Sequence, residues 1–254
     1  MKNFRIIPRL DVKGPNIVKG VHLEGLRVIG NPGDLAKKYY EEGADEILYM
    51  DIVASLYQRN NLTDIVKKAA QEIFIPLTVG GGVRSLEDID KLLRSGADKV
   101  AINTAAINNP RLINDAAKRF GSQCIVVSVE AKKISENVWH CFTDNGREKT
   151  GVNVIEWCQK VVDLGAGEIL LTSIDKEGTF KAFDIGLVEK ISPHVKIPVI
   201  ACGGAGSPQD IQNVIEKGKA DAVAVASILH YEKFSLLDIK KHLNQNNIGI
   251  RLIN

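Results

Sequence analysis

The sequence lacks the features that mark several large classes of protein. Among its 254 residues no apolar run approaches the length of a membrane-spanning helix, and residues 1–9 hold no apolar segment of the kind that a signal peptide needs. No basic run stands out, since 33 Lys and Arg residues are balanced by 31 Asp and Glu residues, for a net charge of +2. We therefore expect neither a membrane protein nor a nucleic-acid-binding protein.

Patterns for metals and disulfides are missing as well. The four cysteines form no Cys-x-x-Cys pair, and the five histidines show no spacing suited to a metal. We expect no metal and no cofactor. Free cysteines at this low number are typical of a reduced, cytoplasmic setting.

What the sequence does contain is a regular alternation of two kinds of segment. Continuous apolar runs predict strands that are buried on both faces, and amphipathic stretches between them predict helices. The eight expected strands are 5–11, 46–51, 76–80, 99–103, 124–130, 168–173, 198–202 and 222–226. Strict β/α alternation predicts a parallel sheet, and eight units predict an α/β fold of one domain over residues 1–254, a closed (β/α)8 TIM barrel.

An internal repeat supports this barrel. The pattern Ile-Pro, Gly-Gly, Ser and Asp-Ile within residues 75–89 recurs within residues 197–211, an offset of 197 − 75 = 122. The chain is therefore expected to consist of two half-barrel repeats of four units each. An irregular excursion over 130–150 holds a short expected strand at 138–142 and an Asn-Gly turn signal.

Two carboxylates end expected strands half a barrel apart. Active sites of such barrels lie at the carboxyl ends of the strands, and there Asp11 ends the first strand and Glu130 the fifth. Facing carboxylates suit general acid and general base roles. Carboxylates at strand ends also serve as loop anchors, and position alone does not decide between these roles.

Glycine pairs follow the third and seventh strands and are related by the repeat. Gly81-Gly82 follows the third expected strand and Asn103-Thr104 lies at the end of the fourth. In the same way, Gly203-Gly204 follows the seventh and Ala226-Ser227 lies at the end of the eighth. Glycine lets the backbone approach a ligand, and exposed N–H groups bind phosphate. The duplicated set favours two phosphate sites over glycines that only relieve crowding in tight turns.

Further charged residues lie at both ends of the expected barrel. Lys19, in the loop after the first strand, is either a group that closes over an anionic ligand or a solvated surface lysine. Four residues of alternating sign stand at the other ends of strands: Arg5, Glu46, Lys99 and Glu168. Taken alone, such a ring is more typical of a stabilising set of ion pairs.

Several strings together resemble one enzyme family. RIIP at 5–8, LDVK at 10–13, VKGV at 18–21, IPLTVGGG at 75–82, FGSQC at 120–124 and GGAG at 203–206 are similar to the cyclase subunit of imidazole glycerol phosphate synthase, over essentially the whole chain. The resemblance implies a lyase of histidine biosynthesis in a glutamine amidotransferase complex. It would take ammonia from a partner glutaminase subunit, as a heterodimer, and convert a bis-phosphorylated phosphoribulosyl-formimino aminoimidazole carboxamide ribotide to imidazole glycerol phosphate and aminoimidazole carboxamide ribotide.

The resemblance also implies roles for individual residues. Asp11 and position 130 match the catalytic carboxylates, for which we expect Asp11 as general acid and Glu130 as general base. Asp98 matches a residue that docks the glutaminase, and the ring of Arg5, Glu46, Lys99 and Glu168 matches the gate of an ammonia channel, which replaces the purely stabilising interpretation. The residues assigned to substrate and phosphate binding are Lys19, Gly82, Asn103, Thr104, Gly178, Thr179, Gly203, Gly204, Ala226 and Ser227.

Two positions depart from the family pattern. Arg9 stands where the family usually has cysteine, and Glu130 where it usually has aspartate. A carboxylate displaced by about 1 Å can cost on the order of a hundredfold in rate. The departures leave open a paralogous ammonia-channelling barrel that serves the amidation of a surface-polysaccharide sugar. A related sugar isomerase and a non-catalytic activator of the glutaminase are further alternatives.

Overall fold

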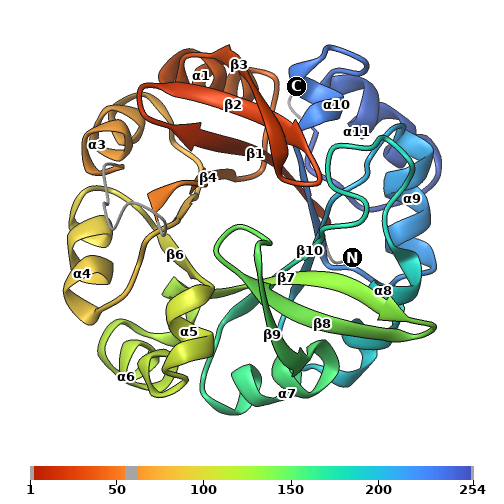
Figure 1. Cartoon of the computed structure of the whole chain (residues 1–254). Helices are drawn as coiled ribbons and strands as arrows, with labels where there is room; N and C mark the ends of the chain where they lie inside the picture. Colours follow the sequence, from red (N-terminus) through yellow and green to blue (C-terminus); the bar gives the residue numbers. More distant parts are fainter. Residues whose placement is uncertain (1–2, 55–61, 253–254) are drawn as a thin grey trace.

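The computed structural model describes residues 3–54 and 62–252, and its centre is a closed barrel of eight parallel strands (Figure 1). β1 pairs with β12 and β7 pairs with β10, which closes the ring. In order around the barrel the strands are β1 Arg5–Lys13, β4 Ile47–Asp51, β5 Leu77–Gly80, β6 Lys99–Ile102, β7 Ile125–Ser135, β10 Glu168–Ser173, β11 Val199–Cys202 and β12 Ala222–Val225. The predicted TIM barrel is confirmed, with all eight strands in place.

Helices surround the barrel on the outside (Figure 1). Several begin where capping residues predict a start: Asn31 accepts from the backbone of Gly33 and Asp34, and Ser85 and Ser207 each accept from the third helical N–H. The helices are α1 Pro32–Glu41, α3 Thr63–Glu72, α4 Leu86–Arg94, α5 Thr104–Asn108, α6 Arg111–Phe120, α7 Val154–Asp163, α8 Ile185–Ile191, α9 Pro208–Glu216, α10 Ser227–His230 and α11 Leu236–Gln245. Among the described residues, no helix has the length and apolar character that a membrane crossing requires.

Two apolar layers hold the barrel together. The larger lies between the strands and the helices, and the smaller fills the inside of the barrel, with members such as Leu48, Val126, Leu170 and Ile200. Along β1 the side chains alternate between the layers, because Ile6 and Leu10 belong to the outer one and Ile7 to the inner one. The odd-numbered side chains of β1 therefore point into the barrel.

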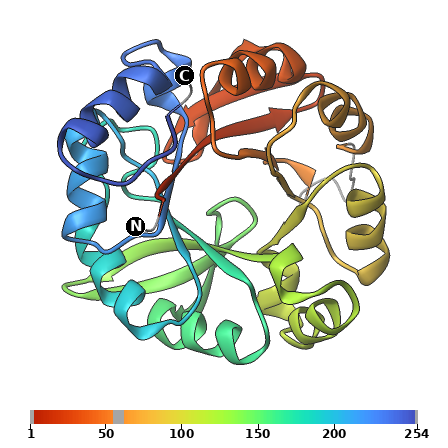
Figure 2. The ribbon, with the colours of Figure 1, turned by 180° about the vertical axis from the view of Figure 1, so that it is seen from behind.

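Two hairpins extend from the carboxyl ends of the strands and lie across one end of the barrel, which we call the mouth (Figure 1). One is formed by β2 (Asn16–Val21) and β3 (Glu24–Gly30), the other by β8 (Val138–Thr143) and β9 (Glu148–Asn153). The excursion after β7 holds the expected strand and turn, whereas the hairpin after β1 was expected only as a loop. At the opposite end of the barrel, the residues that the structure describes form no such hairpin (Figure 2).

The two halves of the chain repeat each other in backbone detail. Gly81 and Gly203 have φ angles of 103° and 99°, in the region that side chains avoid. Asn103 (φ −121°, ψ −85°) and Ala226 (φ −131°, ψ −78°) share one unusual conformation, each directly before a short helix. The internal repeat read from the sequence is thus a repeat of structure at the mouth.

Candidate active site

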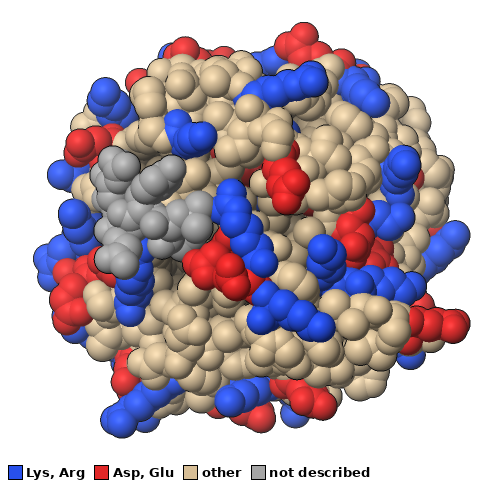
Figure 3. Space-filling model, viewed as in Figure 1, with Lys and Arg blue, Asp and Glu red and all other residues tan. Residues whose placement is uncertain are grey.

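The mouth of the barrel gathers charged side chains of both signs near its centre (Figure 3). Asp11 on β1 and Glu130 on β7 both lie here and are both buried. The structure therefore brings the two predicted carboxylates to the same end of the barrel. Their surroundings differ, as the contacts of each carboxylate show.

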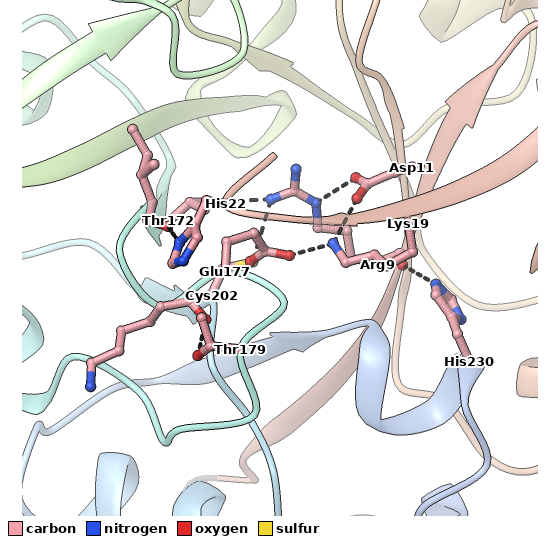
Figure 4. Close-up of polar contacts among 11 residues, drawn as sticks. Arg9, Asp11, Lys19, His22, Thr172, Glu177, Thr179, Cys202 and His230 are labelled. Carbon is pink, nitrogen blue, oxygen red and sulfur yellow. Dashed lines mark hydrogen bonds and ion pairs between the residues drawn. The ribbon is translucent and has the colours of Figure 1, made fainter. Parts of the chain in front are cut away.

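Asp11 is held by two cations inside the barrel (Figure 4). Its Oδ1 accepts from Arg9 Nε at 2.8 Å, and its Oδ2 accepts from Lys19 Nζ at 2.8 Å. Lys19 also donates to Glu177, so that Arg9, Asp11, Lys19 and Glu177 form one chain of ion pairs, which we call the quartet. Burial alone would raise the pKa of Asp11, but the Arg9 and Lys19 cations outweigh it and hold this pKa at about 2.

Lys19 is part of the buried site. Its side chain is 2% exposed, which excludes the solvated surface lysine considered from the sequence. Burial lowers the pKa of Lys19, yet Asp11 and Glu177 together raise it above its ordinary value. The residue lies on β2, and the backbone N–H of His22 at the end of this hairpin donates to the carbonyl of Glu177 at 2.8 Å. The hairpin and the loop after β10 are therefore fixed to each other.

Glu130 occupies a different environment. Its Oε2 accepts from the backbone N–H of Gly146 at 2.8 Å, at the tip of the β8–β9 hairpin. Burial is the main cause that raises the pKa of Glu130 to about 7, against the opposing effects of Arg9 and the Gly146 N–H. A carboxyl group with this pKa exchanges its proton near neutral pH, as general acid–base catalysis requires.

The first predicted phosphate site opens into a large cavity. Gly82, Asn103 and Thr104 line a space of about 300 Å³, and Glu130 lines the same space. Gly81 allows the close approach of two chain segments here, because a Cβ at this position would lie 2.2 Å from the carbonyl oxygen of Asp51. A cavity of this size holds a small-molecule ligand.

The second predicted site is much smaller in this structure. Gly178, Gly203, Gly204, Ala226 and Ser227 line a space of about 10 Å³, which is room for roughly one water molecule. The Glu177 and Phe180 side chains line it too. Thr179 is not among its lining residues, and the Thr179 hydroxyl donates to the carbonyl of Lys176 at 2.8 Å. The two halves thus share a backbone pattern but offer unequal space.

The predicted ring at the opposite end is a closed cycle of ion pairs. Arg5 bonds to Glu46 at 2.8 Å and to Glu168 at 2.7 Å, and Lys99 bonds to the same two carboxylates, both at 2.9 Å. The ring closes the axis of the barrel at the amino ends of the strands. Its members are partly exposed apart from the buried Glu46.

Asp98 carries a structural contact that the sequence did not reveal. Its Oδ2 accepts from the N–H of Leu77 at 2.8 Å, and Asp221 accepts from the N–H of Val199 at 2.8 Å in the second half. The carboxylate thus fixes the start of a neighbouring strand in both halves. Asp98 also borders a surface cavity of about 500 Å³ beside the highly exposed Phe74.

Three further residues of the site, Glu177, Cys202 and His230, were not predicted from the sequence. Asp175, two residues after the end of β10, anchors a loop by accepting from the Lys133 N–H at 2.8 Å, whereas the nearby Glu177 reaches the quartet. Cys202 and His230 also lie against the quartet through Arg9. An acidic residue directly before Gly178 was the available signal for Glu177; no motif pointed to the other two.

Comparisons with known proteins agree on one family. A model of the family described as histidine biosynthesis protein matches residues 5–235. A relative from Legionella pneumophila, named imidazole glycerol phosphate synthase subunit HisF, is 61% identical over 210 residues, which are 83% of this chain and 99% of the relative. Relatives of the same name from two strains of Dehalococcoides mccartyi, BAV1 and CBDB1, are each 48% identical over 254 residues, the full length of both chains.

Proposed function

Because this chain belongs to the histidine biosynthesis protein family, we propose that it is the cyclase subunit of an imidazole glycerol phosphate synthase. In this reaction ammonia and the bis-phosphorylated ribotide give imidazole glycerol phosphate, aminoimidazole carboxamide ribotide and water. The single observation that carries the proposal is the large cavity at the mouth, which is lined both by Gly82, Asn103 and Thr104 and by Glu130, whose carboxyl group has a pKa of about 7.

The large cavity provides the parts that ring closure needs. One phosphate of the ribotide binds at Gly82, Asn103 and Thr104, where the backbone comes close to the ligand. The reacting atoms then lie toward Glu130, which lines the same space. Water is excluded by the two hairpins, because Leu23 of one hairpin and Phe142 of the other pack with Ile174, which follows β10, in an apolar cluster.

The second phosphate binds at Gly178, Gly204 and Ser227 in this proposal. This site of about 10 Å³ must widen for a phosphate to enter, and Glu177 and Phe180 are the largest of the residues that line it. Movement of the loop after β10, together with the β2–β3 hairpin that is bonded to it, would widen this site. Lys19 then supplies a cation beside the incoming anion, because it already contacts Glu177.

Ammonia and a partner are assigned to the opposite end of the barrel. The relatives' names describe subunits, and we propose a glutaminase as the companion of this chain. The ring of Arg5, Glu46, Lys99 and Glu168 lies on the axis at that end, where it would admit ammonia. The surface around Phe74 and Asp98 is the proposed docking area, since an exposed aromatic side chain beside a hollow is typical of a binding surface.

A second candidate function is favoured by one observation. The second site has room for roughly one water molecule and not for a phosphate, which fits a barrel that passes ammonia to an acceptor other than the ribotide. That acceptor would be a surface-polysaccharide sugar, aminated by a separate enzyme.

One experiment separates the two functions. The purified chain is mixed with an ammonium salt and the ribotide, and both products are resolved by chromatography. Stoichiometric formation of the two products supports the cyclase. A folded sample without turnover contradicts it and leaves the second candidate.

A further inference from the structure

The interior of the barrel holds four side chains of β1 in one column. Arg5 belongs to the ring at the amino end, Ile7 to the apolar layer, and Arg9 and Asp11 follow toward the mouth. Arg9 therefore lies between the apolar layer and Asp11. It is 2% exposed and is the only described arginine classed as buried.

The guanidinium of Arg9 reaches other walls of the barrel. Its Nη1 lies 3.3 Å from Thr172 Oγ1 on β10 and 3.4 Å from Cys202 Sγ on β11. β10 is three strands away from β1 around the barrel, so the side chain spans the interior (Figure 4). A planar, permanently charged group held on three strands has little freedom to move.

The contacts of the quartet engage both carboxylate oxygens of Asp11. Each of its two oxygens accepts from a different cation, and Lys19 on one side is held in turn by Glu177. The quartet contains two positive and two negative groups and is neutral as a whole. A proton added to Asp11 would break at least one of these pairs and leave a buried cation without its partner.

We propose that Arg9 is a positioning residue that keeps Asp11 a fixed anion and leaves Glu130 as the one group of this pair that transfers protons. Only the identity of the reaction rests on the proposed function; the assignment of the two carboxylates rests on the contacts of the quartet. The general acid role expected for Asp11 thereby passes to Glu130.

Within residues 3–54 and 62–252, each charged or titratable neighbour of Asp11 fits this assignment. Arg9 and Lys19 face it from β1 and β2, Glu177 from the loop after β10, and Cys202 from β11 behind Arg9. On the α10 side lies His230. Its Nε2 donates to the carbonyl of Arg9 at 3.1 Å, so its Nδ1 accepts from the Tyr39 hydroxyl at 2.7 Å.

This histidine is neutral, because burial lowers its pKa to about 4. Burial raises the pKa of Cys202, so that its thiol also stays neutral. Neither neighbour offers Asp11 a proton near neutral pH. Glu130 is faced by the Gly146 N–H, by Asp144 and, within the barrel, by Arg9 and Asp11.

Ammonia first condenses with the carbonyl carbon of the ribotide, whose oxygen leaves as water, and the proton transfers of the ring closure that follows can be served by one carboxyl group. The Glu130 carboxylate takes a proton from the nitrogen that forms the new bond to carbon. The resulting carboxylic acid gives that proton to the nitrogen whose bond to carbon breaks, and the carboxylate is restored. A group with a pKa near the working pH performs both transfers, as one residue does in other acid–base enzymes.

The direct test is a titration of the carboxyl carbons by NMR in protein labelled with ¹³C at Asp and Glu. The Asp11→Asn and Glu130→Gln variants identify the two signals. We expect no titration of Asp11 between pH 4 and 9 and a midpoint near 7 for Glu130. In Arg9→Cys the midpoint of Asp11 should rise by about one to three pH units, and in Arg9→Lys it should stay low.

The controls separate a local effect from a general one. Arg94→Cys removes an arginine from a surface pair with Asp90 and should shift neither signal. A midpoint of Asp11 above pH 5 in the native chain overturns the proposal, as does an unchanged midpoint in folded Arg9→Cys. If Arg9→Cys does not fold, the titrations of Asp11 in the native chain and in Arg9→Lys still test the proposal.

A second measurement uses turnover with the ribotide at known concentrations of neutral ammonia. In the native chain, the turnover rate should fall as the pH drops below about 7. The residual activity of Asp11→Asn should keep this acid limb of the pH–rate profile, whereas the acid limb should vanish in Glu130→Gln. Loss of the limb in Asp11→Asn would overturn the assignment. Absence of turnover in the native chain would refute the proposed reaction alone, because the NMR titration does not depend on it.

Discussion

Replacing Glu130 with glutamine should make this protein more stable at alkaline pH. The pKa of Glu130 is raised from 4.5 to about 7, chiefly because its charged form is buried. Between these two pH values the folded chain binds the proton more tightly than the unfolded chain. Stability therefore falls as pH rises through this interval, and the full loss is present above pH 7.

The structure gives the size of this effect. A difference of 7 − 4.5 = 2.5 pH units corresponds to about 3 kcal/mol, at 1.36 kcal/mol per unit. Glutamine is close in shape to glutamate, and its amide oxygen can still accept from the N–H of Gly146. The variant should therefore gain about 3 kcal/mol at pH 8 and nothing at pH 4.

Thermal and urea unfolding of both proteins at pH 4, 6 and 8 measures this gain. For a chain of this size, 3 kcal/mol corresponds to a rise in Tm of roughly 6–12 °C. Glu156→Gln, on an exposed part of α7 near its N-terminus, serves as a control for the loss of a surface carboxylate. A variant that is less stable than the native chain at pH 8, or a gain that does not change with pH, would refute the reasoning.

Three further outcomes follow from the contacts at the two ends of the barrel. Asp11 contributes about 2 kcal/mol from its lowered pKa (3.8 − 2 = 1.8 pH units), a contribution present above pH 4 and lost as pH falls toward 2; acid unfolding of Asp11→Asn against the native chain should show its loss. Gly81→Ala should unfold the mouth and abolish ligand binding, because its Cβ would meet the Asp51 carbonyl at 2.2 Å, whereas Gly14→Ala, in open space, should cost only about 1–2 kcal/mol in a melting experiment. Lys99→Ala opens the ion-pair ring and should change glutamine-dependent turnover of the complex more than ammonium-dependent turnover; equal changes in both would argue against an axial passage.

The barrel itself could be predicted from the sequence, because its strands are continuous apolar runs and because the same glycine-containing pattern occurs in both halves of the chain. Capping residues such as Asn31 and Ser85 fixed the starts of helices through contacts that are local in the chain. The hairpin after β1 was not predicted, since β3 (Glu24–Gly30) has little buried apolar surface and no alternating pattern. That residues 1–254 form one domain stays a prediction.

The candidate site was predictable only in part. The positions of the strand ends predicted Asp11 and Glu130, and the internal repeat predicted both glycine-containing phosphate sites. The different surroundings of Asp11 and Glu130 could not be predicted from the sequence, because they depend on long-range contacts. Lys19 and Glu177 are 158 positions apart, and Arg9 contacts Cys202 across 193 positions. For the same reason, the sequence did not predict that Lys19 is buried.

The central claim is that this chain inserts ammonia nitrogen into an imidazole ring. The most direct measurement supplies ¹⁵N-ammonium and unlabelled ribotide to the purified chain and examines both products by mass spectrometry. The account predicts one ¹⁵N atom in imidazole glycerol phosphate and none in aminoimidazole carboxamide ribotide. Unlabelled products, or intact ribotide after prolonged incubation with folded protein, would contradict it.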